Sequence, residues 1–392
     1  MTDHPDYPLI NMPRLRRLLD ESGFDAVLAV APETVAYTSG FYDSHLRTLR
    51  ERMHCTISPC AGEPGFVVPA PPPRSRSRWE TSFITDVREY GRGAPPFIAV
   101  LADMLKARGL LRGRLGIEMG QWPARHFLDL QEALPEATFV DGTRVLDEAR
   151  AVKTEAEIEL LTHAGRQTEK AIQIAFSLAQ AGRPLKDVAD TMGCAVMRLG
   201  ADIVAFNDIY TGWEEGTRGG HADPAKILER GDMILVDFGA LFSGYYSDLA
   251  RMAVVGPPTD RQRDRYQRVR DVQQAIIASM RPGVTCAEVY EAAAAGFRRV
   301  GLRWLWDEVE EGEVRRRFYT CGHSVGLGLH EYPLLTPIEE RVLEPDMVFY
   351  VEPIYRDVGE QKYQIEDLVR ITGQGAEVLT GSMDTRLPYV ID

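Results

Sequence analysis

The stretch VDFGALFSGYYSDLAR, residues 236–251, is apolar but carries an aspartate near each end. Two short strands around a tight turn account for this pattern, since Gly244 can take the positive φ that such turns need. Asp237 and Asp248 are equally distant from the middle of Phe242–Ser243, which predicts the turn at that point. The aspartates would then face each other, with Cβ atoms about 5 Å apart.

A later part of the chain repeats this arrangement. The segment 227–239 (ILERGDMILVDFG) resembles 342–353 (VLEPDMVFYVEP), and 247–253 (SDLARMA) resembles 366–372 (EDLVRIT). Both copies hold a strand, a turn and a returning strand with acidic residues on both strands. Two matches in the same order favour an internal repeat over coincidence.

Glu352 and Glu366 take the place of the aspartates in the second copy. They are equally distant from Gly359, which predicts a second hairpin. Like charges at facing positions of buried strands are costly, and a bound cation removes that cost. Because carboxylate oxygens suit divalent metals, the four acids predict a metal site, whereas two exposed hairpins with solvated acids are the alternative.

Histidines follow in the glycine-rich stretch YTCGHSVGLGLHEYP, residues 319–333. His323 lies among small residues, where the backbone can approach a ligand, and His330 comes seven residues later. His221 precedes the Asp237 strand after a flexible loop. A lone histidine is more often a packed core residue, but the four acids favour a metal-binding role for His323.

The pattern of elements divides the chain into two domains near DEARAVKT. Residues 1–150 alternate strands and helices, as an α/β domain does. Residues 151–392 begin with a long amphipathic helix and a second helix, and two more helices interrupt the strands that follow. This pattern predicts an α+β domain that contains the repeat.

Charge and composition exclude several classes of protein. The 392 residues carry a net charge of −13, which argues against binding to nucleic acid or to an anionic membrane surface. No run approaches the roughly 18 apolar residues of a membrane span, and the N-terminus lacks a signal-peptide pattern. The five scattered cysteines predict reduced thiols rather than a disulfide framework. We therefore expect a cytoplasmic protein.

Together these residues resemble the creatinase/methionine-aminopeptidase family, whose catalytic domain has the pita-bread fold. RLRRLLDESGFDAVLAVAPETVAYTSGF is similar to the N-terminal domain of creatinase and prolidase, and EARAVKTEAEIELLTHAGRQTEKA to the family's entry helix. Metal-dependent members carry an Asp, a second Asp eleven residues later, a His in a GHxxG motif, a Glu before Pro and a late Glu. In this sequence the matching residues are Asp237, Asp248, His323, Glu352 and Glu366.

The resemblance implies two divalent ions, Mn, Co, Fe or Zn, bridged by a hydroxide. Asp248 and Glu366 would bridge the ions. Asp237 would hold one ion, and His323 with Glu352 would hold the other. Paired ions of this kind lower the pKa of water and polarise a carbonyl group.

The resemblance also implies catalytic roles. Glu352 would pass the nucleophile's proton to the leaving nitrogen, and His221 and His330 would hydrogen-bond the scissile group and its tetrahedral intermediate. The resemblance exposes two departures from proline-specific members: Gln364, and Tyr319 where those members often have a histidine. Gln364 stands where prolidase-like members have an arginine that organises the carboxylate end of the site. Gly239 stands where a lyase relative has a metal-binding aspartate, which disfavours a lyase.

The implied activity is hydrolysis of a peptide or amide C–N bond, as in an Xaa-Pro dipeptidase or aminopeptidase. Open alternatives are a small-molecule amidohydrolase of the creatinase or ectoine-hydrolase type, a lyase on a small zwitterion, and a non-catalytic binding module. The resemblance also implies a homodimer in which the first domain reaches a neighbouring active site. Arg47, Arg50 and Arg52 could bind a substrate carboxylate there, or form a solvated basic helix.

Overall fold

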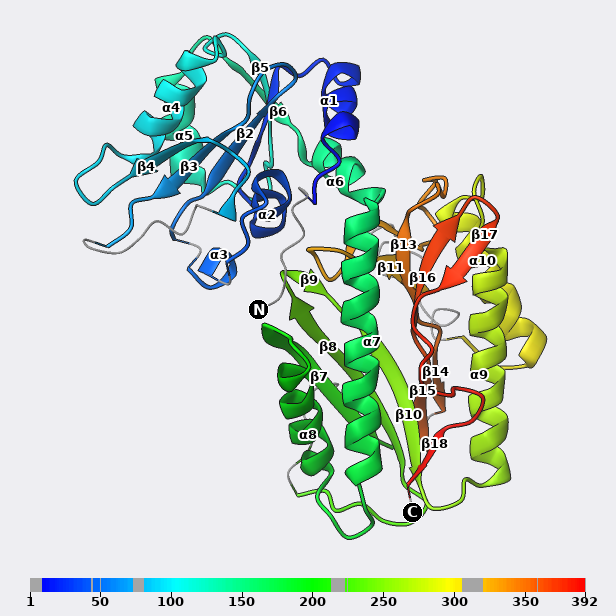
Figure 1. Cartoon of the computed structure of the whole chain (residues 1–392). Coiled ribbons are helices and arrows are strands. Elements are labelled where there is room, and N and C mark those ends of the chain that lie inside the picture. The colour runs from blue at the N-terminus through cyan, green and yellow to red at the C-terminus, as the bar shows by residue number, and fades with distance from the viewer. Residues whose placement is uncertain are drawn as a thin grey trace. The chain divides into compact units, whose positions relative to one another are not determined.

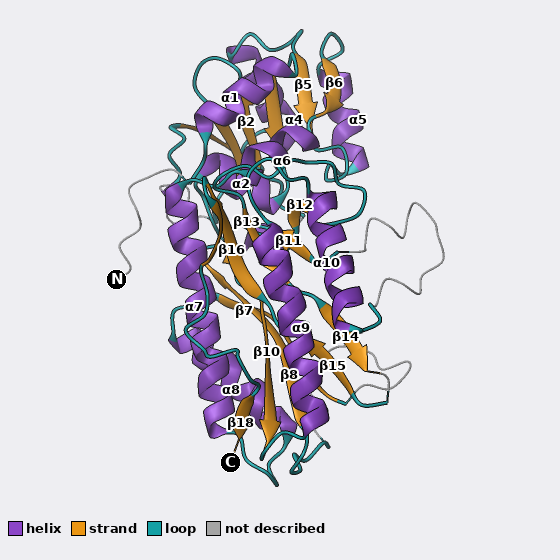
Figure 2. Ribbon diagram, turned by 90° about the vertical axis from the view of Figure 1, so that its right-hand side faces the viewer, coloured by secondary structure: helices purple, strands orange, loops and turns teal. Residues whose placement is uncertain are grey.

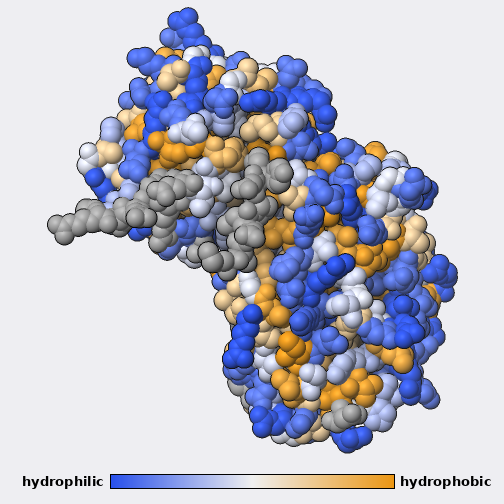
Figure 3. Space-filling view, in the orientation of Figure 1, coloured by the Kyte–Doolittle hydropathy of each residue, from blue (hydrophilic) through white to orange (hydrophobic). Residues whose placement is uncertain are grey.

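The chain forms two compact units, Met1–Arg150 and Ala151–Asp392, in a computed structural model (Figure 1). Within the described ranges, no helix is both long and apolar enough to cross a membrane. Hydrophilic residues cover the outward side of the second unit's arginine-rich helix α9 (Asp260–Ser279) (Figure 3). The structure describes residues 9–43, 45–49, 51–72, 81–212, 223, 225–304, 320–357 and 359–391.

The first unit is built around a mixed sheet with the strand order β4-β3-β2-β1-β5-β6. Strands β1 and β2 are antiparallel, whereas β1 and β5 are parallel. Apolar side chains of α4 and α5 form one core with one face of this sheet. The predicted α/β architecture is confirmed. The elements are α1 (Met12–Glu21), β1 (Ala26–Ala29), α2 (Pro32–Ser39), α3 (His45–Thr48), β2 (Cys55–Pro59), β3 (Gly65–Pro69), β4 (Asp86–Tyr90), α4 (Phe97–Ala107), β5 (Arg114–Ile117), α5 (Ala124–Ala133), β6 (Thr138–Asp141) and α6 (Thr143–Ala151).

In the second unit, strands lie between two pairs of helices, α7 with α8 and α9 with α10 (Figure 2). Capping boxes start α7, α9 and α10, each with a threonine N-cap that accepts a backbone hydrogen bond. Apolar residues of α9 and α10 form a core with β8, β10, β13 and β16. The helices are α7 (Glu155–Leu178), α8 (Leu185–Arg198), α9 and α10 (Cys286–Val300).

The strands of the second unit form two five-stranded sheets and a separate hairpin, β14-β15. One sheet has the order β18-β10-β8-β7, with β9 paired to β8, and the other has the order β12-β11-β13-β16-β17. The strands are β7 (Ile203–Thr211), β8 (Met233–Phe242), β9 (Tyr245–Tyr246), β10 (Leu249–Val255), β11 (Gly322–Ser324), β12 (Glu331–Leu334), β13 (Val348–Val351), β14 (Ile354–Asp357), β15 (Gln361–Gln364), β16 (Asp367–Thr372), β17 (Gly375–Val378) and β18 (Tyr389–Ile391).

The first predicted hairpin forms, but its predicted register is wrong. The turn residues are Ser243 and Gly244, with φ of 49° and 85°, so Asp237 faces Ala250 rather than Asp248. Asp248 lies in the break between β9 and β10, two positions from Ala250. Side chains in a strand alternate with a period of two, so this slip leaves both aspartates on the same face.

The second hairpin has the predicted register. Val351 pairs with Asp367 and Ile354 pairs with Gln364, which sets Glu352 opposite Glu366 in the gap between these pairs. Gly359 lies in the turn with φ of 84°. The two hairpins belong to β8–β10 and β13–β16, and each ladder is antiparallel, as the sequence repeat predicts.

Candidate metal centre

The acidic residues of both hairpins converge with a histidine in the second unit. Carboxylate oxygens of Asp237, Asp248 and Glu366 all lie within 4.8 Å of one another. His323, on β11, places Nε2 3.5 Å from Oδ2 of Asp248, 3.8 Å from Oε1 of Glu352 and 3.9 Å from Oε1 of Glu366. The five residues picked out in the sequence therefore lie together, although they come from two different sheets.

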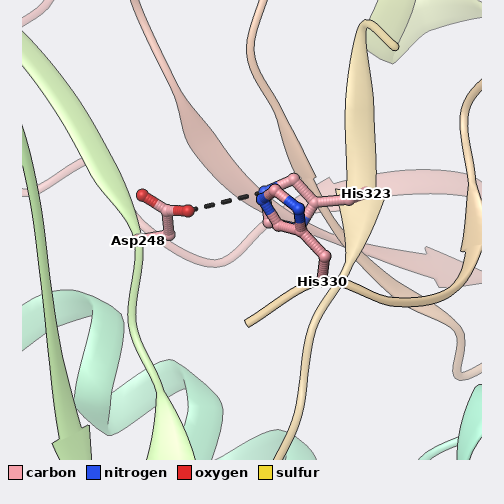
Figure 4. A group of neighbouring side chains, drawn as sticks. All are labelled: Asp248, His323 and His330. Atoms are coloured by element: carbon pink, nitrogen blue, oxygen red, sulfur yellow. Dashed lines mark ion pairs between the residues drawn. The ribbon is translucent and has the colours of Figure 1, made fainter. Parts of the chain in front are cut away.

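His330 joins this cluster from the loop before β12. Its ring centroid lies 4.1 Å from that of His323, and both rings face Asp248 (Figure 4). Ligand atoms of Asp248, His323 and His330 also lie within 4.8 Å of one another. Partial burial lowers the pKa of His330 to about 4, with help from His323, so its ring is neutral near pH 7 although part of it reaches solvent.

Burial, together with crowding of the acids, raises the pKa values of Asp237, Glu352 and Glu366. Burial, followed by the charge of Asp248, raises the pKa of Asp237 to about 8. The same two causes raise the pKa of Glu366 well above its usual range, and burial raises that of Glu352. Burial and mutual repulsion therefore disfavour the charged forms of these three carboxyl groups when no cation is present.

Unpartnered buried atoms show that the cluster fits a metal. Oδ1 of Asp248, Nε2 of His323 and both carboxylate oxygens of Glu366 have no hydrogen-bond partner within the described part of the chain. His323 Nδ1 lies 3.1 Å from the carbonyl oxygen of Ser324. With the proton on Nδ1, the lone pair of Nε2 is left for a ligand. Buried oxygens and a nitrogen without partners form a donor set that a divalent cation satisfies.

Arg251 contacts the backbone and side chains next to the acidic cluster. The sequence did not predict this role. Its buried guanidinium lies 2.6 Å from Glu169 and 2.7 Å from Asp367, and it donates to the backbone carbonyl of Glu366. Gln273 donates to the other oxygen of Asp367 at 3.1 Å. This network fixes the backbone that carries Glu366.

Lys153 and Glu331 form contacts beside His323. The sequence did not predict these contacts either. Lys153 Nζ lies 2.8 Å from Oγ of Ser324 and 3.4 Å from Oε2 of Glu331. A Cβ at Gly326 would lie 2.6 Å from that same Glu331 oxygen, so this position must lack a side chain. A lysine just before the long helix was the available signal, but its partner 178 residues later could not be read from the sequence.

Gln364 connects two of the acids. Its Nε2 donates to Oε2 of Glu352 at 3.1 Å and lies 3.4 Å from Oδ2 of Asp237. Gly239 lies nearby on β8, where a Cβ would meet the ring of Phe206 and the carbonyl oxygen of Ser247. An aspartate at that position would therefore clash, and the expectation that Gly239 disfavours a lyase stays a prediction.

The remaining predicted residues lie in the first unit or outside the described part of the chain. His221 and Arg50 lie outside the described residues. Arg47, in α3 of the first unit, forms an ion pair of 2.5 Å with Glu33. Arg52 lies 4.0 Å from Glu51. Their predicted role at a neighbouring subunit's site stays a prediction.

Comparison with known proteins agrees with this architecture. Residues 12–152 match the Creatinase/Prolidase N-terminal domain, and residues 159–373 match Metallopeptidase family M24. An Xaa-Pro dipeptidase from Lactobacillus helveticus is 26% identical over 95% of this chain and 96% of that protein. An Xaa-Pro dipeptidase from Pyrococcus furiosus is 30% identical over 60% of this chain, and the match spans only 65% of that relative.

A solved structure extends the likeness to both units. The X-Pro aminopeptidase from Thermotoga maritima superposes with a TM-score of 0.78 at 25% identity, and the match covers 97% of this chain and 99% of that chain. The family implies a divalent metal, which agrees with the donor set found here. The chain therefore belongs to Metallopeptidase family M24, with a creatinase/prolidase N-terminal domain ahead of a pita-bread catalytic domain.

Proposed function

We propose that this metallopeptidase hydrolyses the peptide bond before proline in short Xaa-Pro peptides. The observation that carries the proposal is the set of buried oxygens and a ring nitrogen that lack partners, at the meeting point of both hairpins. Similar proteins from Lactobacillus helveticus and Pyrococcus furiosus are Xaa-Pro dipeptidases, which supports the substrate.

Two divalent ions would be held by Asp237, Asp248, His323, Glu352 and Glu366. Of these residues, Asp248 and Glu366 are buried and have carboxylate oxygens within 4.8 Å of each other and of Asp237. A donor set of carboxylates and one imidazole suits Mn, Co, Fe or Zn. Such ions supply an activated water and polarise the substrate carbonyl.

Glu352 is proposed to move the proton. Its carboxylate would take a proton from the attacking water and pass it to the leaving nitrogen. The hydrogen bond from Gln364 fixes one carboxylate oxygen. His330 would hydrogen-bond the scissile group from its place beside His323, and His221 is proposed for the same task.

A substrate panel on Mn- and Co-loaded protein tests this proposal. Xaa-Pro dipeptides should be cleaved, and longer Xaa-Pro peptides and small zwitterionic amides should be assayed beside them. Asp237→Ala and Glu352→Gln should abolish turnover while circular dichroism stays unchanged, and Asp237→Ala should also lower the metal content. Unchanged turnover in either variant would overturn the assignment.

A small-molecule amidohydrolase is the second candidate, and the neutral Gln364 favours it. Cleavage of a small amide together with resistance of every Xaa-Pro peptide would select this alternative. We also propose a homodimer, for which light scattering should give twice the mass of the chain.

A further inference from the structure

Along one face of the second hairpin, the side chains change from acidic to neutral to basic with distance from Glu352 and Glu366. Glu352 faces Glu366, and the next pair on the same face is Ile354 with Gln364. The pair after that is Arg356 with Lys362. Residues two apart in a strand point to the same side, so acids, a neutral amide and two cations follow one another along this face.

Lys362 reaches back toward the acids. Its Nζ lies 3.9 Å from Oδ2 of Asp237 on β8 and 5.0 Å from the ring centroid of Tyr210 on β7, the strand that pairs with β8. The residue is only 7% exposed. A buried ammonium needs a compensating group, and a contact of 3.9 Å with a shared carboxylate compensates it only weakly.

Other buried cations around the centre have closer partners. Arg251 lies 2.6 Å from Glu169 and 2.7 Å from Asp367. If Asp237, Asp248, Glu352 and Glu366 bind two divalent ions, as proposed above, their charges are balanced by those ions. The charge of Lys362 is then largely left for another anion.

We propose that Lys362, over the ring of Tyr210, forms an anion subsite that binds the free carboxylate of the substrate. In a dipeptide that carboxylate belongs to the C-terminal residue, so the subsite selects dipeptides over blocked or longer peptides. Gln364, between Lys362 and the acids on the same face, would donate to the same end of the substrate. The inference rests on the proposed hydrolase and adds the determinant of its substrate class.

Calorimetry on Mn-loaded protein tests the subsite without turnover. Wild type should bind proline about 10- to 100-fold more tightly than prolinamide, as expected for one charge-assisted hydrogen bond. Lys362→Met should bring the two dissociation constants close together, and Lys362→Arg should keep most of the difference. Lys186→Met, which removes an exposed ion pair with Asp190, is the matched control and should behave as wild type.

A structural role for Lys362 gives a different result. If the residue only balances Asp237, Lys362→Met will weaken proline and prolinamide equally and lower the Mn content, and that outcome overturns the proposal. A second pair of ligands, N-acetylglycine and its amide, separates the two proposals. If no Xaa-Pro peptide is cleaved and proline does not bind, the peptidase is defeated and the subsite is judged by the second pair. It is then overturned if wild type does not prefer N-acetylglycine over its amide, or if that preference survives in Lys362→Met.

Discussion

Lys153 and Glu331 form a buried ion pair that ties the start of α7 to the strand after the two site histidines, although 178 residues separate them. Both side chains are almost fully buried, with 0% and 2% exposed. The same ammonium donates to Ser324, the residue after His323. The pair therefore helps to set the position of His323, the proposed metal ligand.

Lys153→Met should remove the ammonium that lies beside the buried carboxylate of Glu331. We expect a loss of about 3–5 kcal/mol in the free energy of unfolding, measured by urea denaturation. The double variant Lys153→Met, Glu331→Leu removes both charges and should recover most of that loss. If the double variant is as unstable as the single variant, the pair is not the reason for the effect.

Arg251→Met tests the support behind Glu366. It leaves Glu169 and Asp367 without their cation in the interior, so a loss of about 3–5 kcal/mol is expected, together with weaker metal binding. Arg370→Met is the matched control, because this arginine is 21% exposed and pairs with the exposed Glu155. Its loss should stay near or below about 1 kcal/mol. Equal losses of unfolding free energy in the two variants would contradict a stabilising role for the buried network around Arg251.

Removal of the metal with a chelator should make the free energy of unfolding depend on pH. Burial and the charge of Asp248 raise the pKa of Asp237 from 3.8 to about 8. Between these two pKa values the folded state binds more protons than the unfolded chain. The free energy of unfolding of the metal-free protein therefore falls as the pH rises from about 4 to about 8. Bound Mn replaces the protons, and the loss should be much smaller. Melting curves from about pH 5 to about pH 8, with EDTA or excess Mn, measure the difference. Parallel trends would contradict the cluster's role.

Glu157 gives a second, metal-independent pH effect. Burial raises its pKa from 4.5 to about 7, although Tyr245 and the backbone of Thr154 donate to it. The folded state again holds the extra proton, so stability should decline between these values, and Glu157→Gln should flatten the decline. Glu288 has the same capping-box position in α10 but is exposed. Glu288→Gln should keep the wild-type trend, and a flattened curve in that variant would assign the effect to the cap instead.

Residue spacing in the sequence predicted the acidic cluster. Symmetry about Gly359 placed Glu352 opposite Glu366 correctly. The same reasoning misplaced the first turn, because Ser243 takes a positive φ that is uncommon outside glycine. The aspartates still share a face, so the predicted site survives an incorrect register.

Contacts between distant residues could not be predicted in this way. Lys153, Arg251 and Lys362 looked like ordinary charged residues until the fold set their partners beside them. In the first unit, β4 is polar and only partly buried, so an apolar pattern does not reveal this strand. The local sequence pattern indicates which face of a helix or strand is apolar, but it does not indicate which strands pair with each other.

The donors come from two sheets: Asp237 belongs to the β8 sheet, whereas His323 belongs to the β11 sheet. Ions bound there would act as reversible cross-links between the two halves of the repeat. The free energy of metal binding would then also hold the sheets together. Metal supply would in that case govern the lifetime of the folded protein against proteolysis as well as its rate of catalysis.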